Sequence, residues 1–312
     1  MKDDASSSTA YVIARSTLYL GGDARVGHLL PARAVEMSGW FVRAHSRSTY
    51  WLLTTMRSLS RPVVAMVERL SVPGVQLHYA LRKCYLEDAA RSALGSSEVR
   101  QMVVIGGGFD TLALRLHEEF PEVNFIEIDH PATQRVKLEA AAAHDLPREN
   151  LKFLSVDLIQ KTLEESLLSF EAYRPDAETF FLCEGVTMYL TTEEIEKLFH
   201  FVCSHSGANS RLAFTFMESY DGQIRFKDSG AGLNAWLRLR SEPFTWGMAK
   251  DRLPDFLRQN GLEPDEIAAA DALRERYLVP HGLSMRRSLR GNAAVWPGAC
   301  PGIRFEGSDA FA

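Results

Sequence analysis

Residues 103–111 decide the fold, and they read Val103-Val104-Ile105-Gly106-Gly107-Gly108-Phe109-Asp110-Thr111. An apolar strand is expected to run into three consecutive glycines, and an amphipathic helix is expected over residues 111–119. Glycine lets the backbone turn sharply, and it lets a ligand approach where a Cβ would block it. The helix N-terminus that follows attracts an anionic group. The stretch therefore predicts a ligand-binding turn between a strand and a helix. A structural alternative is a glycine turn in which Asp110 only caps the helix.

The rest of the chain after residue 95 repeats the pattern of a short strand followed by a helix. Strands are predicted over residues 101–105, 123–128, 151–156, 179–183 and 211–216. Amphipathic patterns predict helices over residues 132–144, 163–172, 192–205 and 250–260, the last closed by Gly261. Strands that alternate with helices of this length predict an α/β fold with a mostly parallel sheet covered on both faces. Residues 292–296 are a further strand candidate.

The N-terminal part of the chain has a helical pattern instead. Apolar residues recur at helical spacing over residues 31–45, 62–70 and 78–94, and Pro31 and Pro62 suit first helical turns. Residues 1–9 are polar and serine-rich, so a frayed tail is expected there. We therefore expect residues 1–95 to form a helical cap over the site and residues 96–312 to form the core.

Composition and charge argue against several classes of protein. The net charge of −5 does not suit a non-specific nucleic-acid binder, which needs a basic stripe. The local cluster of Arg286, Arg287 and Arg290 is expected to be a solvated face. The sequence shows no basic-then-apolar leader and no apolar run long enough to span a bilayer. A cytosolic protein without a nucleic-acid or membrane partner is expected.

Cysteine and histidine spacing gives no sign of a metal site. The four cysteines, Cys84, Cys183, Cys203 and Cys300, are too widely spaced for a metal site or a disulfide scaffold. Cys183 lies in an apolar stretch and is expected to be a small buried hydrophobic residue. The histidines show no metal-ligand spacing either, so no metal is expected.

Acidic residues follow the next three predicted strands. Asp129 lies about twenty residues beyond the glycines, a spacing at which a carboxylate can accept both ribose hydroxyls. A nicotinamide-dependent oxidoreductase would share these features, but Thr111 stands where the third glycine of its motif is expected. Asp157 and Glu184 follow the third and fourth strands, where they can face an adenine amine and a methionine ammonium. The set favours S-adenosylmethionine as cofactor, although each acid alone could be a solvated loop residue.

Four segments together resemble the leucine carboxyl methyltransferase family, including its bacterial O-methyltransferases of polyketide biosynthesis. Glu184-Gly185-Val186-Thr187-Met188-Tyr189-Leu190 resembles E-G-V-x-x-Y-L, and residues 105–111 resemble L-G-A-G-x-D-T. Glu127-Ile128-Asp129-His130-Pro131, with Gln134 and Lys137, resembles E-V-D-x-P-x-x-x-x-K. Ser241-Glu242-Pro243-Phe244-Thr245-Trp246-Gly247 resembles G-E-P-F-x-F-G. The resemblance covers about residues 81–262 and implies a class I methyltransferase, with a Rossmann-like seven-stranded sheet.

The resemblance also implies a role for each matching residue. The cofactor-binding set would be Gly106 and Gly108 at the methionine moiety, Asp129 at the ribose, Asp157 and Leu158 at the adenine, and Glu184 at the amino group.

Two arginines and a tyrosine are implied on the side of methyl transfer. Arg82 matches a family arginine that binds the cofactor carboxylate and faces the substrate, and its structural alternative is a surface helix arginine. Arg15 is matched to an N-terminal basic residue that reaches the site, and Tyr189 to a substrate-side tyrosine rather than a core aromatic residue. The sequence departs from the family at Leu112, where many bacterial members have arginine, and from Pro280 onward.

We expect an O-methyltransferase of a small molecule, with a carboxyl group as the preferred acceptor. A carboxylate is ionised at neutral pH and needs no general base. A hydroxyl acceptor in a polyketide or peptide natural product would need a base, and His78, His130 and His281 are the candidates. A nicotinamide-dependent oxidoreductase and a non-catalytic cofactor-binding protein remain alternatives.

Overall fold

The computed structural model describes residues 7–70, 74–95, 98–144, 149–158, 160–220, 223–224, 244–283 and 299–300. Its centre is a sheet with the strand order β3-β2-β1-β4-β5-β8. These strands are β1 (Gln101–Ile105), β2 (Asn124–Asp129), β3 (Leu151–Ser155), β4 (Thr179–Cys183), β5 (Arg211–Thr215) and β8 (Ala299–Cys300). Strands β1 to β5 pair in parallel, and β8 runs antiparallel to β5. The predicted α/β fold with a mostly parallel sheet is confirmed. The described residues supply six of its strands, so the count of seven stays a prediction.

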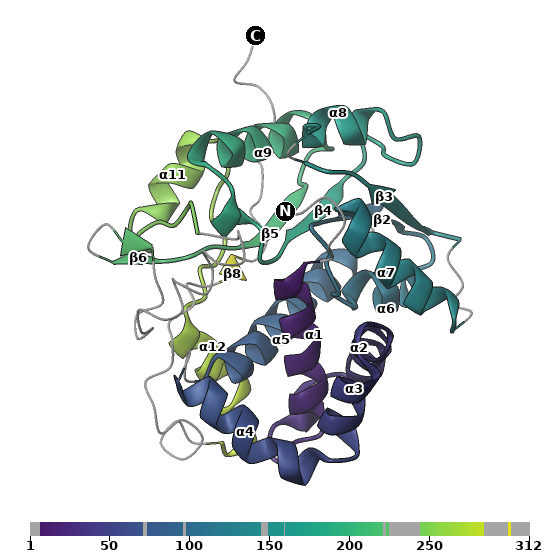
Figure 1. Ribbon diagram of the computed structural model, residues 1–312. Helices are drawn as coiled ribbons and strands as arrows, with labels where there is room; N and C mark the ends of the chain where they lie inside the picture. Colours follow the sequence, from purple (N-terminus) through teal and green to yellow (C-terminus); the bar gives the residue numbers. More distant parts are fainter. Residues whose placement is uncertain are drawn as a thin grey trace.

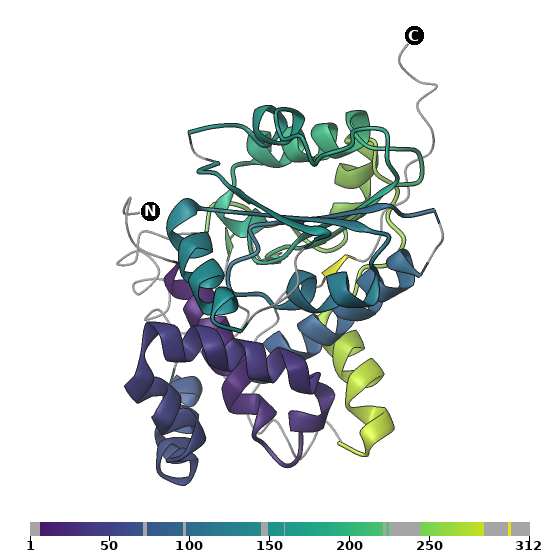
Figure 2. The same ribbon diagram turned by 90° about the vertical axis from the view of Figure 1, so that its right-hand side faces the viewer.

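Helices cover both faces of this sheet, as Figures 1 and 2 show. One face carries α8 (Leu163–Leu168), α9 (Thr192–Ser204) and α11 (Leu253–Gln259), and the other carries α5 (Val75–Leu94), α6 (Leu112–Glu119) and α7 (Pro131–Ala142). Successive strand residues point to opposite faces. In the wholly buried β1, Met102 and Val104 therefore join the core on the α5 side, while Val103 and Ile105 join the core on the α9 side. Apolar residues on both faces are what a sheet covered by two helical layers requires.

The N-terminal helices pack beyond α5 on the same side of the sheet (Figure 1). They are α1 (Ser8–Gly21), α2 (Ala32–His45), α3 (Arg47–Thr54) and α4 (Arg57–Leu70). The expectation of a frayed tail through residue 9 is wrong for its last residues, because α1 begins at Ser8. The Ser7 hydroxyl accepts the Ala10 N–H at 3.2 Å, and the Ser7 N–H donates to the Thr133 hydroxyl at 3.0 Å. Capping and this long-range bond therefore fix the start of α1.

The predicted helix over residues 62–70 begins earlier than expected. Helix α4 starts at Arg57, so Pro62 lies inside the helix rather than in its first turn. The Met56 carbonyl already accepts the Ser60 N–H at 3.0 Å, which sets the first turn ahead of the proline. A proline at this position removes one helical hydrogen bond, the one that its own N–H would have donated to the carbonyl four residues before.

The C-terminal part of the described chain is less regular. A two-stranded hairpin is formed by β6 (Ser219–Tyr220) and β7 (Gln223–Ile224), and α12 (Ala270–Tyr277) packs against α5. Gly261 follows α11 with a φ of 77°, as expected for a glycine that ends a helix. The strand candidate 292–296 and the cluster of Arg286, Arg287 and Arg290 lie outside the described residues. Across the described ranges, no helix combines the length and apolarity that crossing a membrane would take.

Candidate functional site

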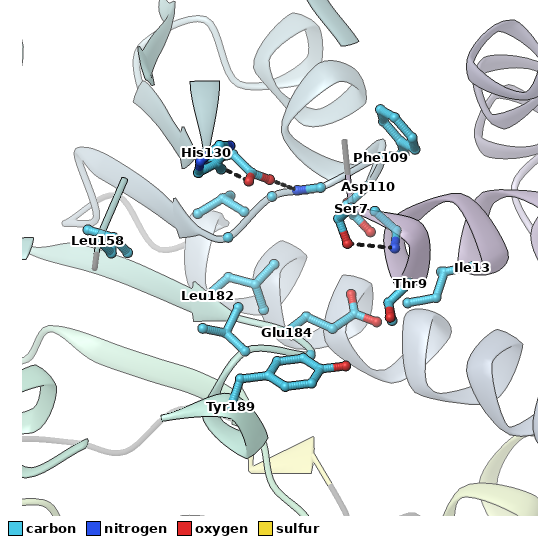
Figure 3. A pocket seen from close by; sticks show the side chains of 18 of the residues that line it. Ser7, Thr9, Ile13, Phe109, Asp110, His130, Leu158, Leu182, Glu184 and Tyr189 are labelled. Atoms are coloured by element: carbon cyan, nitrogen blue, oxygen red, sulfur yellow. Dashed lines mark hydrogen bonds between the residues drawn. The ribbon is translucent and has the colours of Figure 1, made fainter. Parts of the chain in front are cut away.

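A cavity of about 450 Å³ opens where the parallel strands end (Figure 3). Its wall includes Gly106 after β1, Asp129 at the end of β2, Asp157 after β3 and Glu184 after β4. Gly108, Leu158 and Tyr189 also line it. In Figure 3, His130 and Leu158 lie on one side of the cavity and Thr9 and Ile13 on the other. Ligands of open α/β sheets bind at this edge, so the cavity is the candidate site.

The glycine turn forms the floor of the cavity next to β1. Gly106 and Gly108 have φ values of 69° and 50°, a region that glycine adopts without strain. A Cβ on Gly106 would lie 2.3 Å from Val186 Cγ2, and one on Gly108 would lie 3.1 Å from the Cβ of Ala10. The turn is therefore packed between the β4 loop and α1, and it has no room for larger residues.

Asp129 is held in place by the backbone around it. Its Oδ2 accepts the N–H of Gly108, and its Oδ1 accepts the N–H of His130 at 2.6 Å. Burial raises the pKa of the Asp129 carboxyl, and these two hydrogen bonds oppose the rise. Each carboxylate oxygen can accept a second hydrogen bond. Asp129 therefore keeps acceptor capacity for two further donors, such as those of a vicinal diol.

A buried ion pair lies on the inner side of the same turn. Lys137 Nζ of α7 lies 2.5 Å from Glu127 Oε1 of β2, and neither side chain is more than 1% exposed. Burial raises the pKa of Glu127, and the ammonium of Lys137 opposes that rise. The Gln134 amide also donates to the Glu127 carbonyl at 3.1 Å. The family-like segment around Asp129 is thus largely structural support for the turn.

One end of the cavity is suited to an aromatic ring with an amine. Asp157 and Leu158 line it together with Val156 and His130. His130 Nδ1 accepts the Ala132 N–H at 3.3 Å, which places the proton of the neutral ring on Nε2. That Nε2 lies 3.8 Å from Asp157 Oδ2. An apolar platform beside an acceptor carboxylate is what adenine recognition needs.

Two acids and one cation line the other end of the cavity, and a second cation pairs with one of these acids. Glu184 Oε1 accepts N–H bonds from Nε and Nη2 of Arg82, at 2.9 and 2.7 Å. Lys83 Nζ pairs with the carboxylate of Asp110 and lies 3.4 Å from Glu184 Oε2. The Arg82 side chain is 1% exposed, so it is not the surface arginine of the alternative interpretation. Arg82 does not belong to the cavity wall among the described residues, whereas Lys83 does.

Helix α1 closes the cavity from the side opposite the sheet. Ser7, Thr9, Ala10 and Ile13 contribute to the wall. Arg15, predicted to reach the site, is not one of the lining residues, and its guanidinium lies 5.6 Å from the centre of the Tyr11 ring. The structure therefore brings α1 to the site through its first turns and not through Arg15.

The region beside Glu184 carries the predicted acceptor-side tyrosine. Tyr189 lies in a 3₁₀ turn (Thr187–Tyr189), and its ring centre is 5.9 Å from that of Phe244. The Thr245 N–H donates to the Met188 carbonyl at 2.8 Å, which joins the segment at residue 244 to this turn. Of the family-like stretch 241–247, the structure describes residues 244–247.

The three histidines considered as bases are dispersed. His130 lines the cavity at the Asp157 end. His78 is 5% exposed, and burial, with Arg82 nearby, places its pKa well below the usual value. His281 lies against His28, with ring centres 4.8 Å apart. Neither His78 nor His281 is among the lining residues.

Sequence reasoning missed Lys83 and the start of α1 as parts of the site. Lys83 directly follows the family-like Arg82, but Asp110 and Glu184 lie 27 and 101 residues away. No local pattern predicts such pairs. The only available signal was a second cation beside Arg82 on a helix that the resemblance already placed at the site.

Comparison with known proteins agrees with this geometry. The family model described as leucine carboxyl methyltransferase matches residues 36–203, more than half of the 312 residues. A candidate S-adenosyl-L-methionine-dependent methyltransferase of Parafrankia sp. (strain EAN1pec) is 33% identical over 138 residues, 44% of this chain and 43% of the relative. One of Bacillus subtilis (strain 168) is 32% identical over 120 residues, 38% of this chain and 39% of the relative. The matched part thus spans less than half the length of these relatives.

A solved structure shares the fold over nearly the whole chain. It is a candidate methyltransferase of Thermobifida fusca, with a TM-score of 0.54, 12% identity and 95% coverage of both chains. At this identity the likeness concerns the fold alone. The family match, which covers the glycine turn, the strand-end acids and Arg82, carries the assignment. The chain belongs to the leucine carboxyl methyltransferase family of S-adenosyl-L-methionine-dependent methyltransferases.

Proposed function

We propose that the protein is an S-adenosyl-L-methionine-dependent O-methyltransferase that methylates a carboxyl group of a small molecule. The observation that carries the proposal is the convergence of the glycine turn, Asp129, Asp157 and Glu184 on one cavity. At one end of the cavity Asp157 offers an acceptor for the adenine amine, and at the other end Glu184 offers a carboxylate for the methionine ammonium. Bound there, S-adenosyl-L-methionine supplies a methyl group on an electrophilic sulfonium.

The assignment of residues to the cofactor follows the order of the strand ends. Asp157 and Leu158 would hold the adenine, Asp129 the ribose, and Gly106 and Gly108 the chain that leads to the sulfur. Glu184 would receive the ammonium of the methionine moiety, since its Oε2 is the oxygen not bonded to Arg82. A Cβ added to Gly108 would lie 3.1 Å from the Cβ of Ala10, which supports a narrow cradle over the bound chain.

The acceptor would enter beside Tyr189 and Thr245, which line the cavity near Glu184. A carboxylate acceptor is already ionised at neutral pH, so the protein needs only to align it and exclude water. Glu184 and Asp110, two acids of the cavity wall, are both engaged by Arg82 or Lys83. This lack of an available base beside Tyr189, among the described lining residues, favours a carboxyl over a hydroxyl acceptor.

A hydroxyl acceptor in a polyketide or peptide natural product is the second candidate. The observation in its favour is that His130, a group able to take a proton, lines the cavity. Its contacts with Ala132 and Asp157 place it at the adenine end, which weakens this candidate. A nicotinamide-dependent oxidoreductase is disfavoured by the family match.

We further propose that residues 1–95 act as a cap over a core of residues 96–312. The contribution of Ser7, Thr9, Ala10 and Ile13 to the cavity wall supports this division. In this arrangement α1 would exclude water from the methyl group, which is the main demand that methyl transfer makes on the protein.

The test is transfer of a labelled methyl group from S-adenosyl-L-methionine to a panel of small carboxylic acids and phenols. From the carboxylic acids, the proposal predicts labelled products that mild base hydrolyses, because a methyl ester is base-labile. Stable ethers from the phenols alone would support the second candidate. No transfer to either class, with the cofactor bound, would contradict an O-methyltransferase of these substrates.

A further inference from the structure

The N-terminal helices α3 and α4 expose a group of large apolar side chains. Among the described residues, six of the eight exposed large apolar side chains lie on these two helices. They are Trp51, Leu52, Leu59, Val63, Met66 and Val67, with exposed fractions from 43% to 61%. Single exposed apolar side chains are ordinary, whereas a group of them is typical of an interaction surface.

Helix α4 turns its apolar side outward and a more polar side inward. Four of its exposed side chains recur at the spacing of one helix face and form the α4 stripe, which consists of Leu59, Val63, Met66 and Val67. On the inward side, Ser60 is 3% exposed, Val64 packs against the core, and the Arg57 guanidinium donates to the Tyr19 carbonyl. A helix that only covered the core would bury its apolar face, so the α4 stripe requires another explanation.

The charge around the α4 stripe is positive, although the whole chain carries −5. Residues 37–67 contain four arginines and neither aspartate nor glutamate. Arg61 and Arg69 of α4 are exposed, and Arg61 keeps 58% of its side chain exposed with Nη2 3.9 Å from Asp23 Oδ2. The acid of α4, Glu68, accepts hydrogen bonds from the N–H and the side-chain amide of Gln76. The α4 stripe therefore lies beside cations on the same helix.

This combination fits an anionic lipid surface better than a second copy of the chain. A symmetric dimer through α4 would bring the same arginines toward one another, and like charges oppose such a contact. A bilayer surface is flat, and α4 lies at the outer edge of the N-terminal layer (Figure 1), where such a surface can meet its whole length. Helices that lie in a membrane interface combine an apolar face with arginine or lysine on the polar face. Trp51 on the adjoining α3 is of the residue type that is enriched at this interface.

We propose that α4 docks the protein on an anionic membrane surface, with the α4 stripe among the head groups and Arg61 and Arg69 facing the lipid phosphates. The inference is independent of the proposed function, because none of these residues lines the candidate site. It differs from the expectation of no membrane partner, which was based on the charge of the whole chain. Peripheral binding depends instead on the local patch.

Co-sedimentation of the full chain with lipid vesicles tests this docking. One set of vesicles contains equal parts of phosphatidylglycerol and phosphatidylcholine, and the other contains phosphatidylcholine alone. The wild type should bind the anionic vesicles, and it should bind the neutral vesicles more weakly, because only anionic head groups attract the arginines. Added salt should reduce binding to the anionic vesicles, since it screens exposed charges.

Substitutions at exposed positions separate the apolar and the charged contributions. Met66→Ser should lower binding to both kinds of vesicle, by about tenfold, because it removes an apolar side chain from the α4 stripe. Arg61→Ser should lower binding to the anionic vesicles alone, by about fivefold. Leu168→Ser is the matched control, since Leu168 is 45% exposed on α8, across the sheet from α4 (Figure 1). Circular dichroism checks that each variant is folded, and Leu59→Ser replaces Met66→Ser if the latter is not.

Two results overturn the inference. One is a wild type that does not bind the anionic vesicles at low salt, and the other is equal binding by Met66→Ser and the Leu168→Ser control. If the wild type does not bind vesicles and forms a dimer that Met66→Ser dissociates in analytical ultracentrifugation, the α4 stripe is covered by a second copy instead.

Discussion

Glu127 fills the space that a side chain at Gly107 would occupy: a Cβ on Gly107 would lie 2.6 Å from Glu127 Cδ. The family-like pattern L-G-A-G-x-D-T has alanine at this position. The structure links Gly107 to the buried ion pair of Glu127 and Lys137, so this pair packs directly against the glycine turn.

Gly107→Ala should therefore destabilise the protein and disturb the turn. Glu127 is fully buried, so it cannot move away freely, and such overpacking costs about 1–3 kcal/mol. Denaturant unfolding measures the change. Gly39→Ala in α2 is the control, because the nearest atom to its Cβ is a Tyr50 side-chain carbon at 3.3 Å. Equal behaviour of the two variants would count against the packing of Gly107 on Glu127.

Lys137→Met should be among the most damaging single substitutions in the core. It leaves the Glu127 carboxylate buried without its cation, a loss of about 3–5 kcal/mol in comparable pairs. The double variant Glu127→Gln with Lys137→Met removes both charges and should recover much of that loss. Denaturant unfolding of the single and double variants checks this, and no recovery in the double variant would speak against a charge effect.

Tyr189→Phe should lower turnover and leave cofactor affinity unchanged. Tyr189 lines the cavity beside Glu184, on the side proposed for the acceptor, and a misplaced acceptor costs about tenfold to a hundredfold in rate. Methyl transfer and cofactor titration are measured on the same sample. A weakened cofactor with normal turnover would place Tyr189 at the cofactor instead.

Protonation of Asp110 should make the protein less stable in acid. Burial raises the pKa of its carboxyl, but the charge of Lys83 and the hydrogen bond from the Leu112 N–H outweigh burial, and the pKa is lowered from 3.8. A carboxyl with a lowered folded-state pKa contributes stability above its unfolded pKa and loses it as the pH falls through the folded value. Unfolding measured from pH 5 downward should show this loss below about pH 4.

Asp110→Asn removes the titrating group, so its stability should fall less steeply over the same pH range. The comparison is made on slopes, because the variant also loses the ion pair with Lys83 at neutral pH. Identical slopes in the two proteins would show that Asp110 has no lowered pKa.

Local patterns were enough to predict the sheet and most of its helices. The strands β1 and β4 have the predicted bounds, since each is a continuous apolar stretch that ends at a glycine or an acid. The strand-end acids could be predicted as one site, because parallel strands bring their carboxyl ends to one edge. Cys183, predicted to be buried, is 0% exposed within β4.

The features that escaped prediction depend on contacts distant in sequence. Ser7 is fixed by Thr133, 126 residues away, so nothing in its own polar neighbourhood indicated an ordered helix start. The pairing of Arg82 with Glu184 spans 102 residues. From the sequence, Arg82 and Glu184 were each predicted to contact the cofactor, and no local pattern indicated that they bind one another. The start of α4 ahead of Pro62 likewise depends on a first turn that the apolar spacing did not show.

Calorimetric titration with S-adenosylhomocysteine tests the central claim most directly. The account predicts one-site binding by the wild type, weakened by about 1–3 kcal/mol in Asp129→Ala, which removes hydrogen bonds to the ribose. It also predicts no binding of the reduced nicotinamide dinucleotide. An absence of S-adenosylhomocysteine binding, or an Asp129→Ala variant with wild-type affinity, would contradict it.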